Sequence, residues 1–189
     1  MPRPPILPTI DWPTVFTFAK GFEDWLDAAE SPDQAQAIND ALAGQSLEPQ
    51  EEAVVQNLAR LVRVVAFAED WCGDVVRHVP VLQALSDVSG MLHVRYVTRS
   101  EHPAVFVRFL TNGGEAIPKF VFLNEAFVEC GNWGPMPEAC KRLIARGKAC
   151  GDIGAARRLV SARYAADPGK REVIRELLEL AQNTAAVAP

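Results

Sequence analysis

The stretch VVAFAEDWCGDVV, residues 64–76, joins an apolar run to a cysteine and to the start of a helical pattern. The run LVRVVAFA from Leu61 is rich in β-branched residues and alternates little, which predicts a strand buried on both faces. Apolar residues then recur at positions 75, 76, 79, 82 and 85, the spacing of one helix face. Cys72 is therefore expected between the end of a buried strand and the first turn of a helix.

Length and composition favour one globular domain, since 189 residues of which 49% are hydrophobic can bury a large core. The start, Met-Pro-Arg-Pro-Pro, lacks the pattern of a secretory signal, and no run approaches the roughly 18 apolar residues of a membrane span. We therefore expect a cytoplasmic protein that makes no use of a membrane.

The cysteines and histidines are too scattered for a metal site. Cysteines stand at 72, 130, 140 and 150 and histidines at 78, 93 and 102, without the short ligand spacings of zinc sites. They do not resemble a disulfide framework either. No metal is expected.

The charges are unevenly distributed around a net charge of −5. Residues 141–175 hold ten Lys or Arg against three Asp or Glu. Solvated helix faces explain this bias, and nucleic acid is disfavoured because no aromatic residues interleave with the arginines.

The order of predicted elements starts with helices and continues with alternating strands and helices. Phe18, Phe22, Trp25 and Leu26 share one face of a first helix, SPDQ from Ser31 begins a second, and Pro49 a third. After the strand and helix around Cys72 come a strand from Met91, a helix from Ala104, and a β-hairpin with Asn124 and Glu125 in its turn. Helices are expected near 138–148, 152–166 and 169–182.

This order, with EDWCGDV, LTNGGEAIPKFVFL and WGPMP, resembles the thioredoxin fold and a bacterial thioredoxin-like family of that fold. The resemblance covers residues 60–148 and implies an α/β fold with a central mixed sheet flanked by helices. Residues 1–59 and 149–189 would be N-terminal and C-terminal helical extensions of one globular domain. The resemblance also implies that Pro118 is a cis-proline facing Cys72.

Two departures from the thioredoxin pattern affect the chemistry. The second cysteine of the motif is replaced by Val75, and the buried carboxylate six residues before the first is replaced by Ala66. A single thiolate needs an external thiol to release its mixed disulfide, so reduction in the usual thioredoxin manner is disfavoured.

Cys72 is the candidate catalytic residue, because a helix N-terminus favours a thiolate, although Glu69, Asp70 and Asp74 would oppose it. The resemblance implies that Trp71, Gly73, Asp74, Ile117, Pro118 and Trp133 bind substrate. For Trp71 and Trp133, a substrate platform and packing in the core or as a lid are equally good interpretations. The backbone of Ile117 would pair with an extended peptide or with glutathione.

Cys130, at the end of the predicted hairpin, is the best candidate for an unconventional resolving cysteine. Cys140 and Cys150 are interpreted as small buried hydrophobes in helices. Asp74 and His78, one helical turn apart, would form either a surface contact or a general base near Cys72.

Two functions follow from these residues. The first is a monothiol thiol–disulfide oxidoreductase in which Cys72 attacks a disulfide, a glutathionylated thiol or a peroxide of a protein, peptide or small thiol partner. It needs no cofactor beyond glutathione or another small thiol as co-substrate. The alternative is a redox-inactive module that holds a peptide or protein at the Ile117–Pro118 edge. The sequence leaves open whether the chain forms a homo-oligomer.

Overall fold

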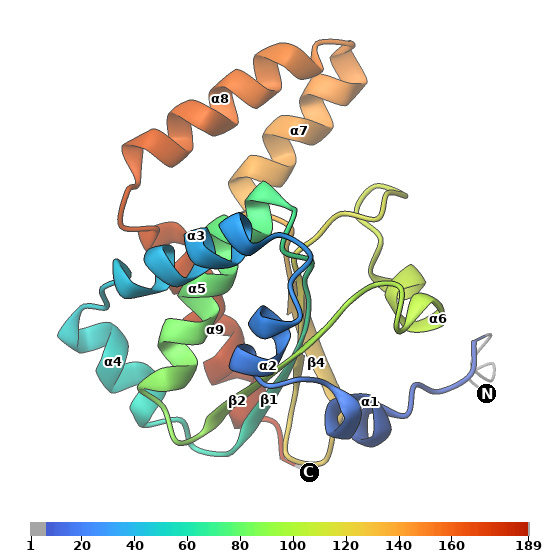
Figure 1. The fold of residues 1–189 in the computed structure, drawn as a ribbon, viewed down its shortest axis with the longest axis vertical. Coiled ribbons are helices and arrows are strands. Elements are labelled where there is room, and N and C mark those ends of the chain that lie inside the picture. The colour runs from blue at the N-terminus through green and yellow to red at the C-terminus, as the bar shows by residue number, and fades with distance from the viewer. Residues whose placement is uncertain (1–6, 189) are drawn as a thin grey trace.

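The computed structural model describes residues 7–188, so the expectation drawn from the first five residues lies outside the described range. In chain order (Figure 1) the elements are α1 (Trp12–Phe18), α2 (Phe22–Asp27), α3 (Pro32–Ala43), α4 (Pro49–Gln56), β1 (Val62–Phe67), α5 (Gly73–Asp87), β2 (Leu92–Val97), α6 (Pro103–Phe106), the 3₁₀ turn η1 (Val107–Phe109), β3 (Lys119–Leu123), β4 (Glu129–Trp133), α7 (Glu138–Cys150), α8 (Ile153–Ala166) and α9 (Arg171–Ala186).

The sheet is mixed, with the strand order β2-β1-β3-β4. Strand β1 runs parallel to β2 and antiparallel to β3, which forms a hairpin with β4. Phe67 at the end of β1 faces both Val97 and Lys119, so the ends of β1 and β2 and the start of β3 meet at one edge. That edge holds Cys72 and Pro118, which follow β1 and precede β3.

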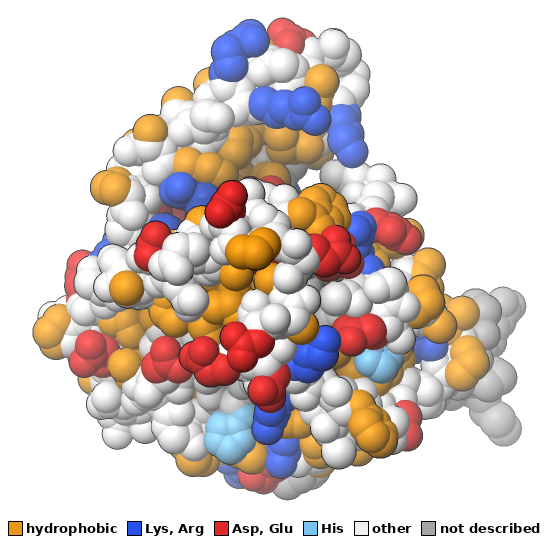
Figure 2. Space-filling model, viewed as in Figure 1, with side chains coloured by type: hydrophobic (Ala, Val, Ile, Leu, Met, Phe, Trp, Pro, Cys, Tyr) orange, Lys and Arg blue, Asp and Glu red, His pale blue; other side chains and the backbone are white. Residues whose placement is uncertain are grey.

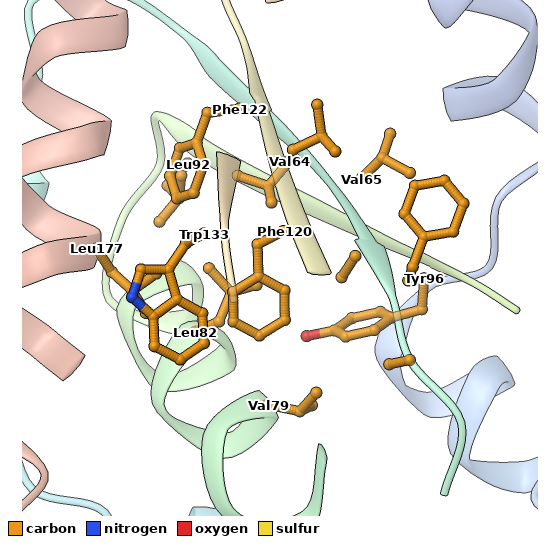
Figure 3. Packing of buried hydrophobic residues seen from close by; sticks show 14 of the residues in the cluster. Val64, Val65, Val79, Leu82, Leu92, Tyr96, Phe120, Phe122, Trp133 and Leu177 are labelled. Carbon is orange, nitrogen blue, oxygen red and sulfur yellow. The ribbon is translucent and has the colours of Figure 1, made fainter. Parts of the chain in front are cut away.

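Helices cover both faces of the sheet. On one face, α5 and α9 pack on the strands, and Figure 3 shows Leu82 and Leu177 near Phe120 and Trp133. On the other, Phe67 packs against Phe106 and Phe109 of α6 and η1, and Trp12 of α1 lies against Phe109. The predicted α/β architecture, a central mixed sheet flanked by helices, is confirmed. No helix within residues 7–188 has the length and hydropathy needed to cross a membrane.

The single helix predicted from Phe18 to Leu26 is wrong. Helix α1 ends at Phe18, whose side chain is 81% exposed, and α2 begins at Phe22. The break arises because Lys20 forms a β-bridge with Tyr96, exchanging backbone hydrogen bonds of 3.0 and 2.9 Å. A continuous helix would leave no backbone groups of Lys20 free for that bridge.

The predicted hairpin is confirmed, although its second strand starts later than the sequence indicates. Residues 124–128 form the loop, and β4 begins at Glu129. The buried Asn124 closes the loop because its side-chain oxygen accepts hydrogen bonds from the backbone N–H groups of Ala126 and Val128. Ser31 caps α3 as expected, accepting from the backbone N–H of Gln34.

Helices α7 and α8 form a hairpin that stands beyond the sheet (Figure 1). Gly151, with φ +74°, ends α7 in the left-handed conformation that favours glycine, and Asp152 caps α8. The hairpin is tight at Gly147, where an added Cβ would lie 2.4 Å from Cβ of Ala156. Cys140 is buried, as expected, but Cys150 is exposed, because it lies at the outer end of α7.

We expect Gly147→Ala to lower the free energy of unfolding by about 1–3 kcal/mol, because the added methyl group overpacks the α7–α8 contact. Gly154→Ala is the matched control in α8, where the nearest group to an added Cβ is the flexible end of Arg158 at 3.6 Å. This control should be neutral or stabilise by up to about 1 kcal/mol, the helix propensity difference. Urea unfolding followed by circular dichroism measures both, and equal values for the two variants would contradict the tight contact.

Candidate active site

Cys72 lies at the N-cap of α5, directly beside the Ile117–Pro118 peptide. Its Sγ is 3.5 Å from the carbonyl oxygen of Ile117, to which the thiol donates, and the Ile117–Pro118 bond is cis. The backbone carbonyl of Cys72, not its sulfur, accepts the N–H groups of Val75 and Val76 at 2.9 and 3.0 Å. The side chain of Val75 is fully buried, so the place of a second cysteine is filled by a core residue.

Trp71 and Gly73 flank Cys72, which is half-buried. Trp71 is 54% exposed, and the guanidinium of Arg99 lies 5.5 Å from the centre of its ring. Nothing lies within 4 Å of where a Cβ would project from Gly73. The partly exposed indole of Trp71 and the open space at Gly73 therefore form the accessible surface next to Cys72.

Arg99 is a site residue that the sequence reasoning missed. It forms an ion pair with Glu69 at 2.7 Å and a longer one with Glu115 at 3.5 Å. The pKa of Arg99 is raised mainly by its hydrogen bonds to Glu69, against partial burial, and the charges of Glu69, Glu115 and Cys72 add to the increase. Burial alone would raise the pKa of Glu69, but bonding to Arg99 lowers it on balance. Arg99 follows β2 at the edge where Cys72 follows β1, and that placement is the signal that could have found it.

The acidic residues near Cys72 have different environments. Arg99 neutralises Glu69, and the buried Asp70 accepts the backbone N–H of Ser31 at 2.9 Å, which ties the start of α3 to this loop. Asp74 is held on the other side by Tyr164 of α8, which donates to its Oδ1 at 3.4 Å. Burial raises the pKa of Asp74, whereas Tyr164 and Arg77 oppose the increase.

His78 is buried and neutral, so the predicted surface contact with Asp74 is wrong. Tyr164 of α8 covers it, with 3.2 Å between its hydroxyl and Nε2 of His78, and Trp133 meets its ring edge-on. Burial, and then the charges of Arg77 and Lys170, lower the pKa of His78 to about 3. The 4.0 Å approach to Asp74 is therefore no ion pair at neutral pH.

Trp133 belongs to the core rather than to an exposed platform. Its indole stacks on Phe120 with 5.3 Å between ring centres and donates from Nε1 to Glu176 at 2.6 Å. Figure 3 shows the indole beside Phe120 and Leu177. Of the two interpretations of this residue, the geometry supports packing.

The register of the sheet separates Cys130 from Cys72. Cys130 follows Glu129, which pairs with Leu123 at the end of β3. Leu123 pairs in turn with Arg63 near the start of β1, so Cys130 lies at that end of the sheet. Cys72 follows Phe67 at the opposite end of β1, and Arg63 and Phe67 are about 13 Å apart because they are four residues apart along it. A disulfide needs Cα atoms within about 7 Å, so Cys130 cannot resolve a Cys72 disulfide without a large rearrangement.

A second loop supports the cis-proline. Gly134 has φ +114°, and an added Cβ would lie 2.1 Å from the carbonyl oxygen of Pro118, so only glycine fits this approach. The buried Lys119 donates to the carbonyl oxygen of Gly134 at 2.8 Å and to Oγ1 of Thr111 at 3.1 Å. Burial, and then Lys141, lower the pKa of Lys119 to about 8. Sequence reasoning also missed Lys119, although it directly follows Pro118.

The fold and this geometry define a class of protein: a thioredoxin-fold protein with a single cysteine at the N-cap of the helix that follows β1. A family model described as Thioredoxin matches residues 19–149, so the chain belongs to this thioredoxin-like family. No curated protein matches the chain. Within residues 7–188, no group of three His, Cys, Asp or Glu side chains could hold a metal ion.

Two solved structures share the fold. One is a Pseudomonas aeruginosa protein of unknown function, 15% identical, with a TM-score of 0.68 over 91% of this chain and 97% of the other. The second is an HIV epitope-scaffold, 14% identical, with a TM-score of 0.66 over 90% of this chain and 97% of the other. At these identities the likeness concerns the fold alone.

The depressed pKa of His78 predicts acid sensitivity. The unfolded state binds a proton near pH 6.5 and the folded state only near pH 3, so stability from this group falls as the pH drops between those values. His78→Gln removes this titration, and between pH 7 and pH 4 it should lose about 3 kcal/mol less than the unmodified protein. Asp74, whose pKa is raised, acts in the opposite direction below neutral pH in both proteins.

Urea unfolding at each pH measures this difference, with His93→Gln as the control, because His93 is exposed on β2. The control should follow the unmodified protein. Parallel pH profiles for His78→Gln and His93→Gln would show that His78 is not buried in its neutral form.

Proposed function

We propose that the protein is a monothiol thiol–disulfide oxidoreductase of a reducing bacterial cytoplasm, acting on mixed disulfides of proteins or peptides. The observation that carries this proposal is the placement of Cys72 Sγ at a helix N-terminus, 3.5 Å from the carbonyl of the residue before a cis-proline. Such a carbonyl lies where the backbone of an extended substrate would pair. The thiol and the peptide-binding edge are therefore parts of one site.

The reaction has two exchange steps, each of which conserves the number of disulfides. The Cys72 thiolate attacks one sulfur of a mixed disulfide, a new S–S bond forms, and the other sulfur leaves as a thiolate with the bonding electrons and takes up a proton. An external thiolate, glutathione or another small thiol, then attacks the Cys72 disulfide and releases Cys72. Val75 offers no internal thiol for the second step, which makes the external thiol obligatory.

One observation favours the alternative, a redox-inactive module that holds a peptide or protein at the same edge. The Sγ of Cys72 donates its proton to the Ile117 carbonyl and receives no capping hydrogen bond from the helix, so no described hydrogen bond is donated to the sulfur. The positive groups beside Cys72 are the Arg99 guanidinium and the helix N-terminus. The two functions differ in whether the sulfur of Cys72 is needed.

We expect the protein to reduce a glutathionylated peptide with glutathione as co-substrate, and Cys72→Ser to lower that rate at least about tenfold, to the uncatalysed level. Cys150→Ser, at the exposed cysteine of α7, is the matched control and should retain the rate. Release of free peptide is followed by chromatography. Equal rates for Cys72→Ser and the unmodified protein, with peptide binding retained, would favour the redox-inactive module.

Val75→Cys should restore an internal resolving thiol, because residues three apart on a helix lie within disulfide range. The unmodified protein should not accelerate reduction of an insulin disulfide by a dithiol, whereas Val75→Cys should accelerate it about tenfold or more. Val79→Cys is the control, since position 79 is equally buried but one turn farther along α5. Acceleration by the unmodified protein itself would contradict the monothiol mechanism.

A further inference from the structure

The α7–α8 hairpin differs in charge from the rest of the molecule. Residues 138–166 contain seven Lys or Arg against two Asp or Glu, a net charge of +5, whereas the rest of the chain has 12 against 22, a net charge of −10. Figure 2 shows Lys and Arg side chains over the part formed by α7 and α8, and Asp and Glu side chains across the body. The hairpin is thus a basic arm on an acidic protein.

Four of these cations are unpaired among residues 7–188. Lys141 and Arg142 pair with Glu138, and Arg163 pairs with Glu172. The other four are exposed and have no acidic group within ion-pair distance in the described part of the chain: Arg146, Lys148, Arg157 and Arg158. Their charges are available to a ligand.

Two of the unpaired cations, Lys148 and Arg157, line a groove of about 520 Å³ between the hairpin and the start of α5. Most of the remaining wall is apolar and consists of Met136, Ile144, Ile153 and Val160, with Tyr164 beside them. The groove therefore combines an apolar floor with two cations.

The groove lies next to the candidate active site. Asp74, which lines it, is two residues beyond Cys72 and accepts a hydrogen bond from Tyr164 of α8. Met136 follows the Gly134–Pro135 loop, in which Gly134 is packed against the backbone of Pro118. A chain that leaves Cys72 toward α8 would thus enter the groove directly.

We propose that the groove binds the part of a substrate protein that adjoins its reacting cysteine, and that this segment is acidic with an apolar anchor. The inference rests on the proposed function and names its substrate class. The anchor would lie on the apolar floor, and the carboxylates would pair with Lys148 and Arg157. In the substrate, the apolar anchor would stand between the reacting cysteine and the acidic residues. This order keeps the substrate carboxylates away from Asp74, which lies at the end of the groove nearest Cys72.

A nucleic acid fits these features less well than an acidic peptide. Within α7 and α8 the only aromatic residue is Tyr164, and the Arg77 guanidinium, 4.1 Å from its ring centre, covers one face of the ring, so the hairpin has no series of aromatic rings on which successive bases could stack. A polynucleotide also has no apolar side chain to place on the groove floor and no sulfur to react with the cysteine. Both features suit a polypeptide that carries a disulfide.

The experiment measures thiol–disulfide exchange between Cys72 and short peptides activated as thionitrobenzoate mixed disulfides, whose leaving group is coloured. Three peptides are compared, each with one cysteine at the same position. After the cysteine, the first has a leucine and two glutamates, the second a leucine and two lysines, and the third a serine and two glutamates. The protein carries Cys150→Ser and Cys130→Ser, so that Cys72 is its most accessible thiol. We expect the leucine–glutamate peptide to react about tenfold faster than either of the others at low salt, and the charge preference to fall at high salt.

Charge reversal assigns the preference to the groove. Arg157→Glu should abolish the preference for glutamate over lysine, and Lys148→Glu should do the same. Arg95→Glu is the control, because Arg95 is equally exposed but lies on β2, and it should retain the preference.

The outcomes separate the inference from the proposed function. Reaction of Cys72 with all three peptides at one rate, or equal loss of preference in Arg157→Glu and Arg95→Glu, would overturn the groove assignment and leave the oxidoreductase intact. If the leucine–glutamate and serine–glutamate peptides reacted equally fast, and both faster than the lysine peptide, the surface would bind anions in general. That result would also overturn the groove assignment. Failure of Cys72 to react with any peptide would overturn the proposed function together with this inference.

Discussion

Burial of β1 on both faces and along both edges is the constraint on which the rest of the structure depends. Its six residues pair with β2 on one side, and five of them pair with β3 on the other. Because both faces are packed, a slip by one residue would move every side chain of β1 to the opposite face, where it would not fit the close-packed core. Its carboxyl end is therefore fixed, and with it the point where the chain turns through Trp71 and Cys72 into α5.

The active-site edge is built from backbone contacts more than from side chains. The cis peptide before Pro118 places the Ile117 carbonyl at the thiol, and the close approach of Gly134 supports that loop from behind. The ammonium of Lys119 then joins the two loops through the Gly134 carbonyl. Charged groups around the edge, Glu69 with Arg99 and Asp70 with the start of α3, are largely occupied with one another, which leaves the thiol and Trp71 as the accessible features.

Local patterns predicted most of the fold. Strand β1, the start of α5, the cap at Ser31 and the β3–β4 hairpin all depend on periodicity or turn chemistry within a few residues, and these predictions agree with the structure. The helix across Phe18 to Leu26 failed because its break depends on Lys20 pairing with Tyr96, 76 residues away. No local pattern contains such a contact.

The candidate site was predicted less completely for the same reason. Cys72 and its neighbours are contiguous in sequence, whereas Arg99, Lys119 and Tyr164 join the site through separate elements. The role of Cys130 was misjudged because strand register decides which end of the sheet it occupies. His78 is buried and neutral because Tyr164 of α8 covers it. Helix α8 lies outside the region that resembles thioredoxin, so the resemblance did not indicate this contact.

The hydrogen bond from Cys72 to the Ile117 carbonyl makes the free protein its own competitor. While the sulfur carries its proton, it occupies the acceptor that a bound peptide backbone would use. A thiolate has no proton to donate, so in the proposed mechanism ionisation of Cys72 would free the carbonyl lone pair before the sulfur attacks, and a mixed disulfide would keep it free. In the proposed function the thiol would hold the place of a substrate donor: the edge would exchange the S–H of Cys72 for the backbone N–H of a bound peptide.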